Sequence, residues 1–316
     1  MLKVIGWAGL ALIGGLIALT LLLVQQRAQA ARVDFPPEGQ FIDVAGHPVH
    51  YVEMGRGPDL VLLHGANGST RDMTFSIAGT LAQSYRVLIF DRPGLGWTPT
   101  LGADMTISDQ ARLLQDAAAQ LGAARPLVVG QSFGGAVMMA WAVNHPDDIA
   151  AAISLAGATH PWEGGQSALY HVLSAAVIGP ALAHLFAAFV PDSYVEGQMA
   201  SVFAPQPEPA GYAAAIGIPV VMRPAQQVSN ARQRTSLHAQ LSALHLRYAE
   251  VTIPIEIVHG DADDTVGLTV HSTRLVDDAP GAVLTVLEGA GHMPHHTHQA
   301  QVIAAIDRAA SRAGLR

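Results

Sequence analysis

A serine between two glycines, directly after a run of valines, is the first residue in this chain whose setting predicts chemistry. In the stretch 128–135, VVGQSFGG, Ser132 follows an apolar segment and opens a segment of helical composition. Core packing does not require this arrangement, whereas a nucleophile on a sharp strand-to-helix turn does, because the glycines let strand and helix approach closely. The hydroxyl would then lie near the positive end of the helix. A tight turn without chemistry is the alternative interpretation.

A serine hydroxyl is a weak nucleophile, so it requires a base, and the base requires an acid that orients it. Asp263 follows one apolar segment late in the chain, and His292 follows the last one. Both positions are the carboxyl ends of predicted strands, which places them at the sheet edge that carries Ser132. Asp261 is the second choice for the acid, and we expect Asp261 and Asp264 to be turn residues.

Other residues exclude or weaken competing chemistries. The chain has no cysteine, and its one lysine is Lys3, so thiol catalysis and a lysine base are excluded from the rest of the chain. The histidines at 292, 295, 296 and 298 have no carboxylate near them in sequence and a proline among them, so we expect no metal site. His295 to His298 are expected to begin the last helix as surface imidazoles, and His64 is expected to be structural.

The segments that must position these residues are short, unbroken apolar runs separated by helical patterns. Such runs are typical of strands covered on both faces, and alternation with helices predicts a mostly parallel sheet with helices on both sides. A hairpin with a turn at 45–48 precedes them. The expected strands are 60–63, 87–90, 127–129, 149–155, 253–258 and 283–287.

One long interval breaks this alternation. Residues 158–250 have helical composition, several prolines and no clear strand, which predicts a helical lid inserted after the sixth strand of the chain. Its apolar stretches 169–178 and 181–190 are interpreted as lid core, with the lining of an acyl pocket as the alternative. The predicted organisation is therefore anchor and tether 1–39, core 40–157, lid 158–250 and core 251–316.

The N-terminus predicts a membrane segment. No residue from Val4 to Val24 is charged, and 21 residues at about 1.5 Å each match a hydrocarbon core of ~30 Å. A cleaved secretory signal is the alternative, because Ala28-Gln29-Ala30 is a small-x-small pattern. The apolar run is longer than a usual signal core, which favours an uncleaved transmembrane helix. The flanking positive charges are nearly balanced, and we expect the catalytic part to lie outside the cytoplasm.

The spaced motifs resemble the α/β-hydrolase superfamily, in particular its lid-bearing, esterase- and lipase-like members. The stretch 64–68 (HGANG) resembles the oxyanion loop of that family, and 91–97 (DRPGLGW) resembles the turn after its next strand. The acid loop corresponds to 260–266 (GDADDTV), and the histidine loop to 289–292 (GAGH). Together these motifs cover most of the chain beyond the tether, in the order Ser, Asp, His that is expected for this fold.

This resemblance implies a role for each residue. Ser132 would attack a carbonyl carbon, His292 would accept the serine proton, and Asp263 would orient the imidazole. The backbone N–H groups of Ala66 and Phe133 would stabilise the oxyanion, each by about 3 kcal/mol of barrier.

The expected function is hydrolysis of a carboxylic ester, apolar or lipid-like, without a cofactor or metal. A cofactor-free haloperoxidase or perhydrolase, or a C–C bond hydrolase, would use the same triad. A dehalogenase or epoxide hydrolase would carry aspartate in place of Ser132, and a non-catalytic binding protein is the remaining class. The net charge of −8 argues against a nucleic-acid partner, so the expected partners are a small-molecule ester and the membrane.

Overall fold

The computed structural model describes residues 2–102 and 105–316, and within them eight strands form one sheet in the order β1-β2-β4-β3-β5-β6-β7-β8. The two pairings of β2 are antiparallel and all others are parallel. This confirms the predicted mostly parallel sheet and its N-terminal hairpin. The strands are β1 (Gln40–Val44), β2 (His47–Gly55), β3 (Asp59–Leu63), β4 (Arg86–Phe90), β5 (Leu127–Gln131), β6 (Ala151–Leu155), β7 (Ile255–Gly260) and β8 (Ala282–Leu287).

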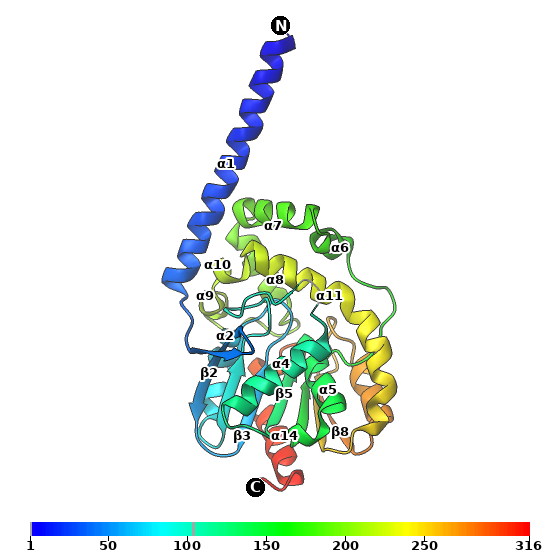
Figure 1. Cartoon of the computed structure of the whole chain (residues 1–316). Coiled ribbons are helices and arrows are strands. Elements are labelled where there is room, and N and C mark those ends of the chain that lie inside the picture. Colours follow the sequence, from blue (N-terminus) through cyan, green and yellow to red (C-terminus); the bar gives the residue numbers. More distant parts are fainter. Residues whose placement is uncertain (1, 103–104) are drawn as a thin grey trace.

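Two hydrophobic layers cover the two faces of the sheet, which explains the unbroken apolar runs. Alternate residues of β3 point to opposite faces: Val61 packs in the layer that contains α4 (Ile107–Gln120) and α5 (Phe133–Asn144). Leu62 packs in the other layer, which contains α2 (Thr70–Phe75), α3 (Ala78–Leu81) and α14 (Gln299–Arg312). A strand buried on both sides needs apolar residues at every position. The helices on both faces are visible in Figure 1.

The interval between β6 and β7, which we call the lid segment, contains helices joined by loops and, among its described residues, no strand. Its elements are α6 (Ala168–Ser174), α7 (Ile178–Phe189), α8 (Asp192–Ser201), α9 (Tyr212–Ile216), α10 (Ile218–Val221), α11 (Pro224–Leu244) and the 3₁₀ turn 245–250. Helices α6 to α10 lie at one end of the sheet, and α11 runs from that end down along the side of the body (Figure 1). The remaining short elements are a 3₁₀ turn at 146–148, a π-helical turn at 269–273, α12 (Arg274–Asp278) and α13 (Pro294–Thr297).

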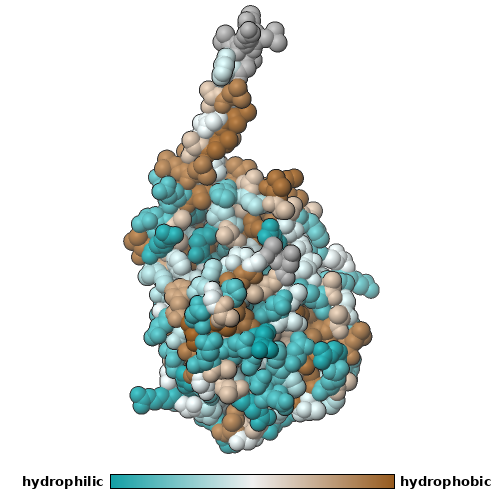
Figure 2. Space-filling view, viewed as in Figure 1, coloured by the Kyte–Doolittle hydropathy of each residue, from teal (hydrophilic) through white to brown (hydrophobic). Residues whose placement is uncertain are grey.

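The N-terminal helix α1 (Leu2–Asp34) projects from the lid end of the molecule, opposite the C-terminus (Figure 1). Its part from Gly9 to Asp34 is long and apolar enough to cross a membrane, and the most apolar stretch of it is almost wholly exposed. A membrane anchor and a signal sequence both have these properties. Figure 2 shows hydrophobic residues along α1 and again at the adjoining end of the body.

Candidate active site

Ser132 occupies the turn between β5 and α5, at the middle of the sheet. Its backbone has φ 52° and ψ −120°, a conformation that costs an L-residue about 1–3 kcal/mol and is typical of a nucleophile elbow. Glycines make the turn sterically possible. A Cβ on Gly130 would lie 2.3 Å from the carbonyl oxygen of Gly134, and a Cβ on Gly134 would lie 2.3 Å from that of Leu63. The local sequence therefore forces the hydroxyl out at the carboxyl edge of the sheet.

Asp263 and His292 come together because β7 and β8 are neighbours and both residues follow the carboxyl ends of these strands. The His292 Nδ1 lies 2.8 Å from Asp263 Oδ2. The other carboxylate oxygen accepts hydrogen bonds from the backbone N–H groups of Thr265 and Val266, at 2.8 and 2.9 Å. The carboxylate thus holds the proton of His292 on Nδ1 and leaves Nε2 as an acceptor.

The charge of Asp263 is maintained although its side chain is buried. Burial alone would raise its pKa, but hydrogen bonds from His259 and His292 outweigh burial and hold the pKa of Asp263 below its usual value. The competing acids have other roles. Asp261 accepts a hydrogen bond from the Gly289 N–H at 2.6 Å, and Asp264 is exposed.

Ser132 and His292 line the same cavity, of about 310 Å³. In the described part of the chain no hydrogen bond joins the Ser132 hydroxyl to His292. Instead, the Gln131 side-chain nitrogen lies 3.4 Å from His292 Nε2 and 3.4 Å from the His292 carbonyl oxygen. Serine and imidazole must therefore move closer before they can exchange a proton, and catalytic hydrogen bonds often tighten only when substrate is bound.

The two proposed oxyanion donors are neighbours because β3 and β5 pair side by side. Ala66 lies in the loop after β3, and Phe133 is the first residue of α5; both line a cavity of about 260 Å³ with Ser132. Among the described residues, neither backbone N–H has a hydrogen-bond acceptor. Both donors are thus available to a ligand oxygen.

A buried arginine holds the loop that carries Ala66. The Arg92 side chain donates hydrogen bonds to the carbonyl oxygens of His64 and Gly65, both at 2.9 Å, and burial lowers the pKa of Arg92 to about 9. His64 Nε2 accepts the Arg92 N–H at 3.0 Å, and burial lowers the pKa of His64 to about 4, so its imidazole is neutral. These contacts leave His64 in a structural position.

The comparisons with known proteins agree with this geometry. The α/β hydrolase fold family matches residues 58–299. The chain belongs to this family. An uncharacterized protein of Mycobacterium tuberculosis, Rv2715, is 28% identical over 296 residues, which cover 86% of this chain and 81% of that protein.

Solved structures of other hydrolases show the same fold. An α/β hydrolase fold protein from Burkholderia ambifaria superposes with a TM-score of 0.69 at 22% identity, over 85% of this chain and 97% of that one. A thermophilic esterase from Thermogutta terrifontis superposes with a TM-score of 0.67 at 17% identity, over 87% of this chain and 99% of that one.

A second sequence relative matches only part of the chain. This 2-hydroxy-6-oxononadienedioate/2-hydroxy-6-oxononatrienedioate hydrolase from Burkholderia vietnamiensis is 34% identical, over 35% of this chain and 40% of that protein.

In this α/β hydrolase, Ser132 stands where two cavities meet. The cavity of about 260 Å³ has a partly polar lining that includes Gln166, Arg234 and His271. The cavity of about 310 Å³ extends under the lid segment, where its lining includes Met199, Val202, Ile216 and Val221. Ala66, Ser132, Arg234 and Thr265 border both. Ser132 therefore borders two spaces, and the one beneath the lid segment has the larger apolar share of its lining.

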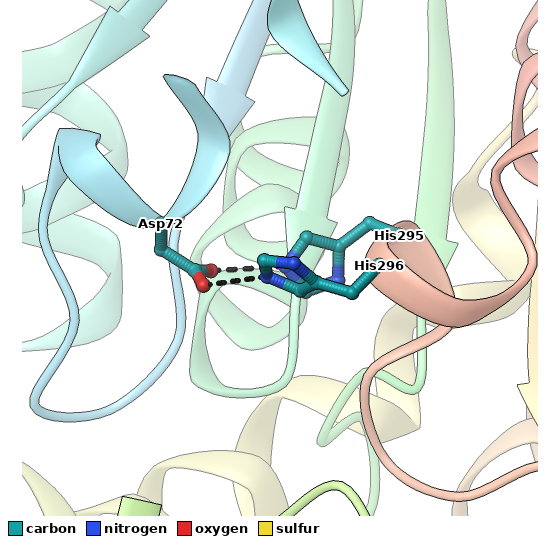
Figure 3. Close-up of side chains that lie close together, drawn as sticks. All are labelled: Asp72, His295 and His296. Atoms are coloured by element: carbon teal, nitrogen blue, oxygen red, sulfur yellow. Dashed lines mark hydrogen bonds and ion pairs between the residues drawn. The ribbon is translucent and has the colours of Figure 1, made fainter. Parts of the chain in front are cut away.

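A second group of histidines lies beside the larger cavity, where Asp72 of α2 meets His295 and His296 of α13 (Figure 3). Each His Nε2 lies 2.9 Å from one oxygen of the Asp72 carboxylate, and the Tyr212 hydroxyl donates to Asp72 Oδ1 at 2.9 Å. Burial would raise the pKa of Asp72, but the two imidazoles outweigh it and hold the pKa well below its usual value. We call these three residues the Asp72 cluster.

The Asp72 cluster corrects two expectations. The side chains of His295 and His296 are 0% and 1% exposed, so they are not surface imidazoles, and they belong to α13, before the last helix. The ligand atoms of the cluster lie within 4.8 Å of one another, a spacing that could hold a metal ion. This cluster could not be recognised from the sequence, because the carboxylate lies 223 residues before His295. The direct hydrogen bonds already occupy both Nε2 atoms.

Three further residues of the site were not foreseen. Gln131 occupies the variable position before the serine, for which the turn motif predicts nothing. His259 lies 3.1 Å from Asp263 Oδ2, and its i, i+4 spacing to that aspartate is the signal that could have identified it. The Arg234 guanidinium lies over the Tyr170 ring. Its Nε donates a long hydrogen bond of 3.4 Å to Gln166 Oε1. Its position in the lid segment gave no such signal.

Proposed function

We propose that this chain hydrolyses carboxylic esters with an apolar, lipid-like acyl group, through an acyl-enzyme formed on Ser132. The observation that carries the proposal is the Asp263–His292 pair, because His292 lines the same cavity as a serine on a positive-φ turn. An oriented imidazole beside a strained, exposed serine is the arrangement that serine hydrolases use.

In the proposed reaction, the Ser132 oxygen attacks the ester carbonyl carbon while its proton passes to His292 Nε2. The backbone N–H groups of Ala66 and Phe133 bind the resulting oxyanion. As the tetrahedral intermediate collapses, the imidazolium returns the proton to the leaving alcohol, and the acyl group remains on Ser132. Water then attacks the acyl-enzyme with His292 as base, which releases the carboxylic acid and restores the serine. Asp263 stabilises the imidazolium in both halves.

The shape of the site supports an ester with two unlike halves. The cavity under the lid segment, which has the larger apolar share of its lining, fits the acyl chain, and the cavity lined by Gln166 and His271 fits the alcohol portion. We infer that residues 158–250 act as a lid over these cavities, between core segments 40–157 and 251–316. No cofactor is required for this chemistry.

We further propose that residues 1–39 anchor and tether the enzyme, with its catalytic part outside the cytoplasm. The packing of α1 supports retention of the helix: the Arg27 side chain lies 2.6 Å from Asp192 of the lid segment, and Ala31 is fully buried. Cleavage after Ala30 would remove Arg27 and this contact. Intact-mass measurement of the cellular protein tests the point, since a secreted product would lack the first 30 residues.

Labelling with a fluorophosphonate probe tests the nucleophile. The full-length protein should be labelled and Ser132→Ala should not, while Ser236→Ala, at an exposed position on α11, should be labelled like wild type. Turnover of short- and long-chain p-nitrophenyl esters then tests the substrate class. A folded protein that is not labelled would contradict the proposal and favour a binding function.

Two other reactions use the same triad, and the comparisons give a reason to test them. The fold is shared with a bromoperoxidase from Bacillus anthracis, and part of the chain resembles the C–C bond hydrolase above. Peroxide-dependent halogenation or cleavage of a dienone, with no ester turnover, would replace the ester proposal. A dehalogenase mechanism has less support, because Ser132 stands where such enzymes carry aspartate.

A further inference from the structure

The N-terminal helix is attached to the lid segment along its second half. Arg27 Nη2 lies 2.6 Å from Asp192 Oδ1, and the ring of Phe35, just beyond the helix, lies against Gly217. Helix α1 also packs on α7 and α10. The lid segment is thereby held at a fixed position along the helix that enters the membrane.

An apolar groove lies between α1 and the lid segment. It has a volume of about 790 Å³, and one of its walls is Leu16 of α1. The remaining lining residues are apolar or aromatic and come from α7 and the start of α8: Leu182, Leu185, Phe186, Phe189, Val190, Pro191 and Tyr194. In water, a groove of this composition and size would be unfavourable.

The position of Leu16 along α1 indicates how deep the groove would lie in a membrane that α1 spans. The uncharged run of α1 extends from Val4 to Val24, and its length of about 30 Å matches one hydrocarbon core. Leu16 is eight residues from the end of that run, which corresponds to ~12 Å of helix. The part from Val4 to Leu16 is only ~18 Å long, too short to span the core alone, and tilting the helix would shorten it further.

The part of the lid segment that would lie at this depth in the membrane lacks charged residues. From Gly164 to Pro191 it contains no Asp, Glu, Lys or Arg. The first charged residue after this stretch is Asp192, and the first after the apolar run of α1 is Arg27; these two residues form an ion pair. The two apolar stretches therefore end at the same level, where charged side chains can reach the headgroups.

Part of this stretch packs as lid core, with Leu173 and Ala183 buried, but several of its large apolar side chains are exposed. Val177 is 82% exposed and Ile178 62%, and both lie at the start of α7. Leu169, Val172, Leu185 and Phe189 are also exposed. Helices α6 and α7, which meet at 110°, together are long and apolar enough to belong in a membrane.

We propose that α7 lies within the hydrocarbon of the near membrane leaflet beside α1, and that acyl chains of bilayer lipids fill the groove between the two helices. The lid segment is then a second membrane contact, and the larger catalytic cavity opens beneath a surface in contact with lipid. This inference rests on the proposed membrane anchor but not on the proposed ester hydrolysis, because it uses no residue of the Ser132 site.

Site-specific fluorescence in vesicles tests the depth of α7. Since the chain has no cysteine, a single introduced cysteine can carry an environment-sensitive label. Leu185→Cys places the label in the groove, and Leu315→Cys is the matched control, with the same residue type and similar exposure (41% and 38%) near the C-terminus. Full-length Ser132→Ala protein, which keeps catalysis out of the measurement, is reconstituted in phosphatidylcholine vesicles that carry nitroxides on the acyl chain or on the headgroup.

The label at 185 should lose about half of its emission with acyl-chain nitroxides and be protected from aqueous iodide, as expected for a helix within the leaflet. The label at 315 should show the opposite behaviour. Equal quenching of both labels by iodide would overturn the proposal. So would copy-to-copy cross-linking at 185 with a short bis-maleimide, which would mean that a second chain fills the groove. Phe189→Cys gives the same readout if the Leu185 variant does not fold.

Discussion

Two buried aspartates in this protein each contact two histidines, yet only one of the two groups is arranged for proton transfer. Asp263 meets His292 through Nδ1, so that Nε2 borders the cavity with Ser132. Asp72 meets His295 and His296 through Nε2 of both rings, so no Nε2 is left free. The same residue types thus give a candidate general base in one place and a network in which both Nε2 atoms are occupied in the other. The two groups differ in which imidazole nitrogen faces the carboxylate: Nδ1 in His292, and Nε2 in His295 and His296.

The largest effects should come from the two groups that exchange the proton. Ser132→Ala and His292→Ala should each lower kcat/KM by about 10⁴-fold or more, and the double variant should be little worse, because members of a triad act as a unit. Steady-state kinetics on the best ester of the panel measures this. Near-normal turnover by folded His292→Ala would show that another residue is the base.

The two aspartates should separate clearly when each is replaced by asparagine. Asp263→Asn should cost about 10⁴-fold in kcat, since the imidazole loses the partner that fixes its tautomer. Asp72→Asn should keep activity within about tenfold and instead lower the free energy of unfolding by about 3 kcal/mol, because a buried carboxylate that accepts several hydrogen bonds is lost. Equal losses of activity in two folded variants would end the distinction between the groups.

Acid should weaken the Asp72 cluster through His295. Burial lowers the pKa of His295 below the 6.5 of an unfolded chain, so the unfolded state binds the proton first as the pH falls. Stability should therefore be full above about pH 6.5 and decline below it, with a further loss below about pH 4, where the carboxylate of Asp72 begins to be protonated on unfolding.

Denaturant unfolding from pH 8 to pH 4 measures this dependence. His295→Gln should reduce the slope below pH 6.5, whereas Ser132→Ala, which removes no titrating group, should follow wild type. An unchanged slope in His295→Gln would assign the acid sensitivity to other buried histidines.

Removal of metal ions should have the smallest effect. If the Asp72 cluster is a hydrogen-bonded network, chelation should leave Tm and ester turnover unchanged, and added Zn²⁺ should not raise Tm. A rise in Tm with Zn²⁺ in wild type that is absent in Asp72→Asn would instead make the cluster a metal site.

Much of the fold could be predicted from the sequence because the sheet is covered on both faces. A strand that is buried on both sides appears in the sequence as an unbroken apolar run, such as 127–129. Ser132, Asp263 and His292 could be proposed because each follows a strand at the same sheet edge, and their catalytic roles stay predictions. The Asp72 cluster could not be foreseen, since its carboxylate and imidazoles come from opposite ends of the chain. His295 and His296 were wrongly expected at the surface for the same reason.

The position of Ser132 between two cavities has a consequence for the order of events in turnover. If the chain hydrolyses esters as proposed, the acyl and alcohol halves of an ester at Ser132 would lie in separate compartments. The alcohol can depart through its own compartment while the acyl chain stays in place. The hydrolytic water can then enter through the space just vacated, so the second half of the reaction need not wait for the buried chain to move.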